Sequence, residues 1–209
     1  MNRPVAGLRG SVGCAIFAEM NPDDFQQYDG LIFDCDGTLA DSMPVHYVAW
    51  HETMSRYGIE FTEERFYSMG GMPSDKIVAM LASEQGVSVD AVGVADEKET
   101  LFRTLIPRVR RNQGVCNVAV AYFQKKPMAV ASGSPRTVVQ EQLAILEIAE
   151  LFQTVVASED TQRHKPEPDV FLEAARRLDV QPERCVVFED SPLGFRAAES
   201  AGMAWVDVR

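Results

Sequence analysis

The sequence predicts an α/β fold, in which a parallel sheet carries helices on both faces and a helical segment is inserted after the first strand. Two observations lead to this prediction. From residue 114 onward, short apolar runs alternate with helical stretches, and no hairpin signal separates them. Between residues 44 and 112, in contrast, nothing alternates as a strand would. We therefore predict a Rossmann-like core and an all-helical cap.

The first strand is predicted at residues 31–33, a continuous apolar run typical of a strand buried on both faces. Asp34 ends the run and Asp36 follows two residues later, so we expect the two side chains to point the same way. Two carboxylates about 4 Å apart repel each other by on the order of 4 kcal/mol at an effective dielectric constant of about 20. A fold tolerates this where a cation lies between them or where the charges take part in chemistry. An acidic turn at the end of the strand is the alternative.

The insertion is predicted to be entirely helical. Ser42 and Pro44 indicate the start of its first helix and Gly58 its end. Pro107 is expected to kink the last helix. The predicted helices of the insertion cover residues 44–57, 62–69, 75–85 and 91–111.

The second half of the chain is predicted to alternate between helices and short apolar strands. The predicted strands cover residues 128–131, 154–157, 185–188 and 204–208. The predicted helices cover residues 115–126, 137–148, 169–178 and 192–201. We predict three parts: an N-terminal extension (1–26), an α/β core (27–43 and 113–209) and a helical cap (44–112).

Polar side chains directly follow several of the predicted strands. They are Asp34 and Asp36, Ser132, Glu159 and Asp160, and Glu189 and Asp190. The carboxyl ends of strands in an open α/β sheet line one crevice, where ligands bind. Hard oxygen ligands without soft ones indicate Mg²⁺. For Glu189 and Asp190, capping of the following helix is an alternative or additional role.

The acids need a cationic complement near the same crevice. Ser132 and Gly133 lie between a strand and a helix start, which suits a phosphate group. Lys165 lies in a loop stiffened by two prolines, although a lone lysine is usually just solvated. Together these residues favour phosphoryl transfer, with Asp34 as the nucleophile and Asp36 as the general acid and base. Mg²⁺, Lys165 and the Ser132 loop would neutralise the charge of the transferring group.

Composition narrows the classes of partner. A formal net charge of −11 argues against binding to nucleic acid or to an anionic membrane surface. The four cysteines are scattered and form no Cys-x-x-Cys pair, which favours a reducing cytoplasm. No apolar run approaches the length of about 18–20 residues that a membrane span needs. We expect a monomer, with residues 1–26 as a flexible or loosely docked extension.

Four segments now carry a resemblance to a known family. Asp34-Cys-Asp-Gly-Thr-Leu, Ser132-Gly-Ser, Lys165-Pro and Glu189-Asp-Ser-Pro-Leu-Gly resemble, in order, the four motifs of the haloacid dehalogenase superfamily. The chain is most similar to the β-phosphoglucomutase-like branch, especially its fructose-1-phosphate-type sugar-phosphate phosphatases. The resemblance covers about residues 28–209. It implies that Asp34, the Asp36 backbone carbonyl and Asp190 bind Mg²⁺, with Glu189 assisting.

Substrate choice is expected to lie with the cap, which should close over the crevice. Candidate contacts are His46, Gly71 in the loop at 70–74, and Lys76. The alternative for His46 is that it merely flanks Trp50 in the core of the cap.

Three functions stay open at this point. The first is a Mg²⁺-dependent phosphatase that hydrolyses small sugar phosphates through an aspartyl-phosphate. A phosphosugar mutase would need a fixed cation in the cap, preferably arginine, where this chain has Ser74, Asp75 and then Lys76. A non-catalytic phospho-ligand-binding protein would not need the second carboxylate at Asp36.

Overall fold

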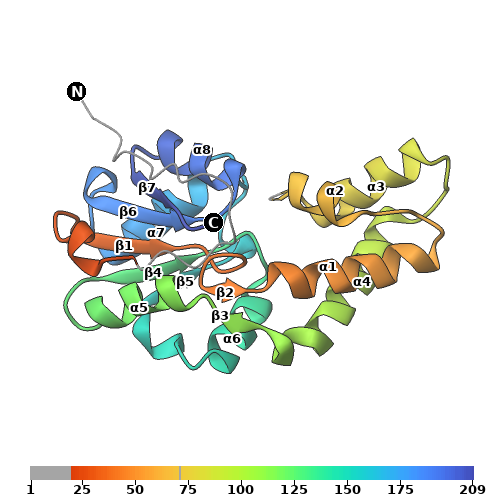
Figure 1. Cartoon of the computed structure of the whole chain (residues 1–209). Helices are drawn as coiled ribbons and strands as arrows, with labels where there is room; N and C mark the ends of the chain where they lie inside the picture. The colour runs from red at the N-terminus through yellow and green to blue at the C-terminus, as the bar shows by residue number, and fades with distance from the viewer. Residues whose placement is uncertain (1–19, 71) are drawn as a thin grey trace.

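The computed structural model describes residues 20–70 and 72–209 and has a parallel five-stranded sheet at its centre (Figure 1). The strands lie in the order β5-β4-β1-β6-β7. Their bounds are Gly30–Phe33 for β1, Met128–Ala131 for β4, Thr154–Val156 for β5, Cys185–Glu189 for β6 and Ala204–Asp207 for β7. The predicted parallel sheet is therefore confirmed, with β1 as its central strand.

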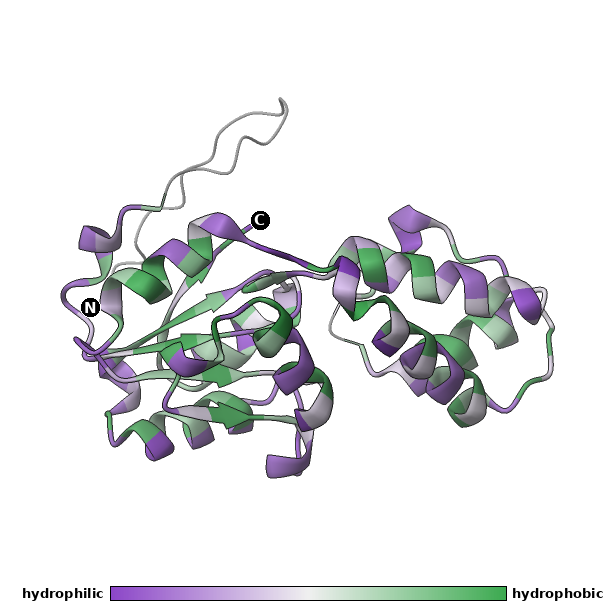
Figure 2. Cartoon of the chain, turned by 90° about the horizontal axis from the view of Figure 1, so that it is seen from below, coloured by the Kyte–Doolittle hydropathy of each residue, from purple (hydrophilic) through white to green (hydrophobic). Residues whose placement is uncertain are grey.

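Helices cover both faces of the sheet, as predicted. Leu31 and Phe33 pack into a buried cluster shared with α5 (Gln113–Tyr122) and α6 (Arg136–Ile145). Ile32 packs on the opposite face, in a cluster shared with α7 (Asp169–Leu178) and α8 (Pro192–Ser200). Successive strand side chains point to opposite faces, so burial on both sides explains why this run is continuously apolar (Figure 2).

Four helices form a separate bundle to one side of the sheet (Figures 1 and 2). They are α1 (Met43–Arg56), α2 (Glu63–Ser68), α3 (Ser74–Glu84) and α4 (Ala91–Leu105). The bundle has a hydrophobic cluster of its own, which includes Trp50, Phe61 and Phe66. The predicted all-helical cap is confirmed, and Trp50 belongs to its core.

A short antiparallel ribbon lies where the chain passes between the sheet and the cap. It pairs β2 (Ala40–Asp41) with β3 (Arg110–Arg111). The ribbon was not predicted from the sequence, because two residues are too few for an alternating pattern. The last cap helix was predicted too long: α4 ends at Leu105, and a 3₁₀ turn at Ile106–Arg108, which contains Pro107, follows it.

The N-terminal segment packs against the core where the structure describes it. The predicted extension at 1–26 lies outside the described residues as far as residue 19. A 3₁₀ turn at Pro22–Phe25 follows, and Phe25 is buried against Phe188 with ring centroids 4.9 Å apart. The Tyr122 hydroxyl donates to the Pro22 carbonyl at 2.6 Å. Within residues 20–70 and 72–209, no helix combines the length and apolar character that a membrane crossing demands.

Candidate active site

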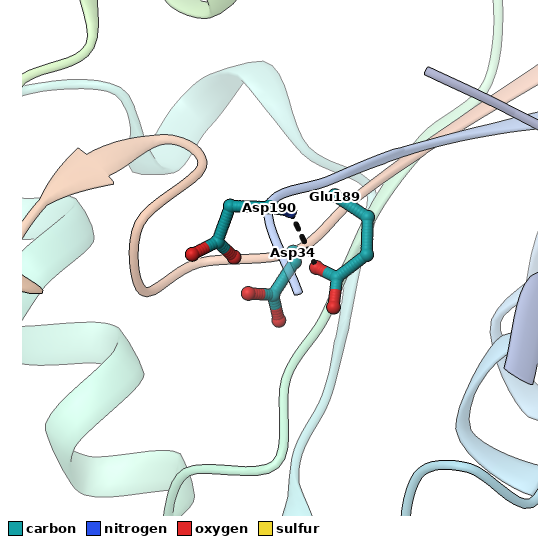
Figure 3. Close-up of side chains that lie close together, drawn as sticks. All are labelled: Asp34, Glu189 and Asp190. Atoms are coloured by element: carbon teal, nitrogen blue, oxygen red, sulfur yellow. Dashed lines mark hydrogen bonds between the residues drawn. The ribbon is translucent and has the colours of Figure 1, made fainter. Parts of the chain in front are cut away.

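Three carboxylates meet at the carboxyl ends of two adjacent strands. Asp34 directly follows β1, and Glu189 and Asp190 lie at the end of β6, which pairs with β1 in parallel. One oxygen of each carboxylate lies within 4.8 Å of the others, and Figure 3 shows the three side chains side by side. Asp34 and Glu189 are buried. The sequence correctly predicted that these acids lie close together, because parallel strands end at the same edge of the sheet.

Lys165 supplies a cation to this cluster. Its Nζ lies 2.8 Å from Asp34 Oδ1 and 3.4 Å from Glu189 Oε1, and only 9% of its side chain is exposed. Burial acts to lower the pKa of Lys165, but the charges of Asp34 and Glu189 raise it above its usual value. The lysine is therefore charged, and it lies beside the proposed nucleophile as the sequence predicted.

One lysine does not balance three acids. Burial and the charge of Glu189 raise the pKa of Asp34 well above its ordinary value. The same two causes raise the pKa of Asp190 to about 7. The cluster is thus short of positive charge, a condition that a divalent cation would relieve.

The residues present fit such a cation. All three carboxylates offer hard oxygen atoms, which Mg²⁺ prefers. Two glycines make room for the carboxylates: a Cβ at Gly37 would lie 2.2 Å from Asp190 Oδ2, and one at Gly194 would lie 1.6 Å from Glu189 Oε1. Participation of the Asp36 backbone carbonyl stays a prediction.

The Asp36 carboxylate is held elsewhere, and it is not part of the acidic cluster found among the described residues. It accepts four hydrogen bonds: from Ser42 Oγ at 2.8 Å, His46 Nε2 at 3.2 Å, Ser134 Oγ at 2.6 Å and Gln142 Nε2 at 2.9 Å. Burial alone would raise the pKa of Asp36, but the hydrogen bonds that its carboxylate accepts, with that from His46 the strongest, hold that pKa well below its usual range. Asp36 is therefore ionised in this arrangement of cap and core.

His46 connects Asp36 to the cap interior. Lys98 Nζ lies 2.9 Å from His46 Nδ1, and Lys98 is 2% exposed. Because a lysine can only donate, Nδ1 accepts, and Nε2 carries the proton that His46 donates to Asp36. Phe102 stacks on the imidazole at 3.6 Å between centroids. Whether His46 contacts substrate stays a prediction.

Sequence reasoning missed three residues of this network. Ser42 was expected to cap α1, but its hydroxyl makes no capping bond and donates to Asp36 instead. Gln142 and Lys98 are polar residues in helices, and both are buried. A buried position on an amphipathic helix was the only available signal, and it does not identify the partner.

The Ser132 loop follows β4, the other neighbour of β1. Ser132 is 1% exposed, and its Oγ accepts from the Ser134 backbone N–H at 3.0 Å. A Cβ at Gly133 would meet no atom within 4 Å, so there is open space beside the loop backbone. The phosphate-binding roles of Ser132, Gly133 and Lys165 stay predictions.

Glu159 and Asp160, which were expected in the crevice, connect the segment after β5 to the start of α6. Glu159 and Asp160 do not join the acidic cluster. Both Glu159 oxygens accept from the Arg136 backbone N–H at 3.1 Å, and Asp160 pairs with the guanidinium groups of Arg136 and Arg177. These two acids therefore hold the start of α6 and the Arg177 side chain, and they do not add to the group formed by Asp34, Glu189 and Asp190.

A cleft of about 670 Å³ lies beside the acidic cluster, between the cap and the core. Gly37 and Asp190 line it, and Tyr67, Ser68, Met69, Gly70 and Met72 line it from the cap. Lys76 is not among its lining residues, and its Nζ lies 3.7 Å from Asp75. Gly71 lies outside the described residues.

Comparison with known proteins decides the family. A family model described as haloacid dehalogenase-like hydrolase matches residues 31–208. The chain belongs to this family. Among curated relatives, fructose-1-phosphate phosphatase YqaB of Escherichia coli is 36% identical over 185 residues, covering 88% of this chain and 98% of that protein. A phosphorylated carbohydrates phosphatase of Thermotoga maritima is 30% identical, covering 84% and 82%.

Solved structures of the family share this architecture. CbbY from Rhodobacter sphaeroides, in complex with xylulose-(1,5)bisphosphate, superposes with a TM-score of 0.76 at 25% identity, covering 85% of this chain and 84% of that one. A β-phosphoglucomutase from Clostridium difficile has a TM-score of 0.76 at 24% identity, covering 86% and 84%, and shows the fold alone.

Proposed function

We propose that this protein is a phosphatase that hydrolyses small sugar phosphates of the fructose-1-phosphate type, with transient phosphorylation of Asp34. The observation that supports this most directly is the environment of Asp34. This buried carboxylate lies against Lys165 and beside Glu189 and Asp190 at the mouth of the sheet. The relatives named above include phosphatases of phosphorylated carbohydrates.

The proposed reaction has two steps, both performed on phosphorus. A carboxylate oxygen of Asp34 attacks, the bond to the sugar oxygen breaks, and Asp36 donates a proton to the leaving alcohol. Water then attacks the aspartyl-phosphate, Asp36 takes its proton, and Asp34 is released with inorganic phosphate. Lys165 and the Ser132–Gly133 backbone and hydroxyl groups hold the phosphoryl oxygens.

Asp34, Glu189 and Asp190 would hold Mg²⁺, together with the Asp36 carbonyl. When bound, the ion supplies positive charge to the phosphoryl group. Asp36 is ionised while its four hydrogen-bond donors hold it, so it must leave them and take up a proton before it can protonate the leaving group. Movement of the cap, which carries His46, provides a way to release it.

We also propose the division into an N-terminal extension (1–26), a core (27–43 and 113–209) and a cap (44–112). Separate hydrophobic clusters in the sheet layers and in the helical bundle support the division between core and cap. We further propose a monomer in a reducing compartment. The reducing compartment is supported by Cys35, Cys116 and Cys185, which are free and buried.

A mutase is less well supported. That reaction needs a cation in the cap to hold a second phosphate. Among the described residues that line the cleft, those from the cap include no lysine or arginine. Incubation with β-glucose 1-phosphate and a trace of the 1,6-bisphosphate separates the two reactions. Formation of glucose 6-phosphate without free phosphate would establish the mutase.

The nucleophile is tested by Asp34→Asn, with phosphate release from fructose 1-phosphate as the measurement. We expect release to fall to background, while circular dichroism shows an unchanged fold. Asp29→Asn is the matched control, because Asp29 lies exposed just before β1 and pairs with Arg184 at 2.8 Å. Turnover that persists in Asp34→Asn would contradict the assignment. Chelation should abolish the activity of the unmodified protein, and Mg²⁺ should restore it.

A further inference from the structure

The cleft beside the acidic cluster contains an arginine that the proposed reaction does not use. Arg196 lies on α8 and lines the cleft together with Asp190. Asp34, Ser132 and Lys165 are not among the lining residues. Asp190 therefore belongs both to the acidic cluster and to the lining of the cleft, so the cleft begins beside the site proposed for the transferred phosphate.

Arg196 is exposed and has no partner among the described residues. It makes no ion pair or side-chain hydrogen bond there, whereas most of the described arginines pair with carboxylates, including Arg65, Arg103, Arg136, Arg163, Arg177 and Arg184. Arg209, the other arginine of the cleft, is bound to Asp207 at 2.6 Å and lies over the Phe195 ring at 5.2 Å. Arg196 is thus the cleft arginine whose guanidinium is available to a ligand.

The cap wall of the cleft carries no charged side chain among the described residues. Tyr67 and Met72 from the cap line it and are 48% and 36% exposed. These surfaces suit the carbon face of a sugar, and they offer a second acidic group no cation, only the hydroxyl groups of Tyr67 and Ser68. An acidic group of the substrate would therefore be drawn to the α8 side of the cleft.

The position of Arg196 on its helix also suits this role. At about 1.5 Å of rise per residue, it lies about 6 Å along α8 from Pro192, the first helical residue after the Asp190–Ser191 turn. Arg196 therefore lies about one turn into the helix that begins directly after Asp190 and Ser191. The planar guanidinium matches a carboxylate or phosphate with two parallel hydrogen bonds.

We propose that Arg196 binds a second acidic group of the substrate, so that phosphosugars with a carboxylate or a second phosphate at the far end are favoured over neutral phosphosugars. This inference rests on the proposed phosphatase function. Both acidic groups share the chemistry that Arg196 recognises, and the substrates used in the test distinguish them.

The test compares kcat/KM for two matched pairs of substrates. One pair is 6-phosphogluconate and glucose 6-phosphate, which differ by a carboxylate; the other is fructose 1,6-bisphosphate and fructose 1-phosphate, which differ by a phosphate. In each pair, the ratio of acidic to neutral substrate measures the contribution of the second acidic group. We expect at least one ratio to fall about tenfold in Arg196→Gln, as for loss of one hydrogen bond to a charged group.

Two further variants make the test specific. Arg196→Lys keeps the charge but not the planar fork, so it should recover part of the lost ratio. Arg184→Gln removes an exposed arginine that pairs with Asp29 at the opposite end of β6 from Asp190, and it should leave both ratios as in the unmodified protein. The inference is overturned if Arg196→Gln leaves both ratios unchanged, or if it slows acidic and neutral substrates equally. Absence of phosphate release from all four substrates in the unmodified protein would refute the proposed function itself.

Discussion

Replacement of Lys165 by methionine tests whether this lysine and a metal ion neutralise the same acids. The Nζ distances of 2.8 Å to Asp34 and 3.4 Å to Glu189 correspond to Coulomb attractions of about 5–6 kcal/mol each at an effective dielectric constant of about 20. Much of this gain is offset by the desolvation of the buried ammonium group. Removal of one partner of a buried pair costs about 3–5 kcal/mol. We expect that loss in the free energy of unfolding when a chelator is present.

Saturating Mg²⁺ should reduce this loss, because the ion supplies the missing charge to the same cluster. The assay is urea unfolding of both proteins, each with chelator and with Mg²⁺, which forms a thermodynamic cycle. The stabilisation by Mg²⁺ should be larger in Lys165→Met than in the unmodified protein. Lys126→Met is the control, because Lys126 donates to backbone carbonyls, including that of Gln26 at 2.7 Å. The free energy of unfolding lost in Lys126→Met should be the same with and without Mg²⁺. An equal loss with chelator and with Mg²⁺ in Lys165→Met would refute the reasoning.

Three other predictions follow from the same geometry. In the absence of metal, the pKa of Asp190 is about 7 in the folded state, whereas the unfolded chain releases this proton above pH 3.8. The melting temperature should therefore fall as the pH rises from 5 to 8. A rise in the melting temperature would contradict the burial of that carboxyl. Gln142→Leu removes one donor to the buried Asp36 carboxylate and should lower the free energy of unfolding by about 1.5–3 kcal/mol, measured in urea, whereas an unchanged value would mean that the other three donors suffice. Arg103→Gln breaks an exposed pair with Glu141 and should cost less than about 1 kcal/mol in the same assay; a larger cost would show that the pair fixes the cap against α6.

The sequence alone was sufficient for the sheet and for the acidic cluster. Apolar runs such as residues 31–33 and 185–188 are local signals, and a strand buried on both faces has to be apolar throughout. The acids that end these runs are equally local. In a parallel sheet, Asp34, Glu189 and Asp190 all lie at the same edge, so the sequence is enough to predict that they lie close together. The position of Lys165 followed from the same rule, since its loop leaves the sheet at that edge.

Only the tertiary structure decided where Asp36, Glu159 and Asp160 point. The rule that residues two apart face the same way holds for an extended strand, but the chain turns at Cys35, immediately after Asp34. The orientation of Asp36 therefore depends on donors such as His46 and Gln142, which lie far away in the sequence. Such contacts depend on how helices pack against each other, and helix periodicity specifies only which face is buried, not which side chain it meets.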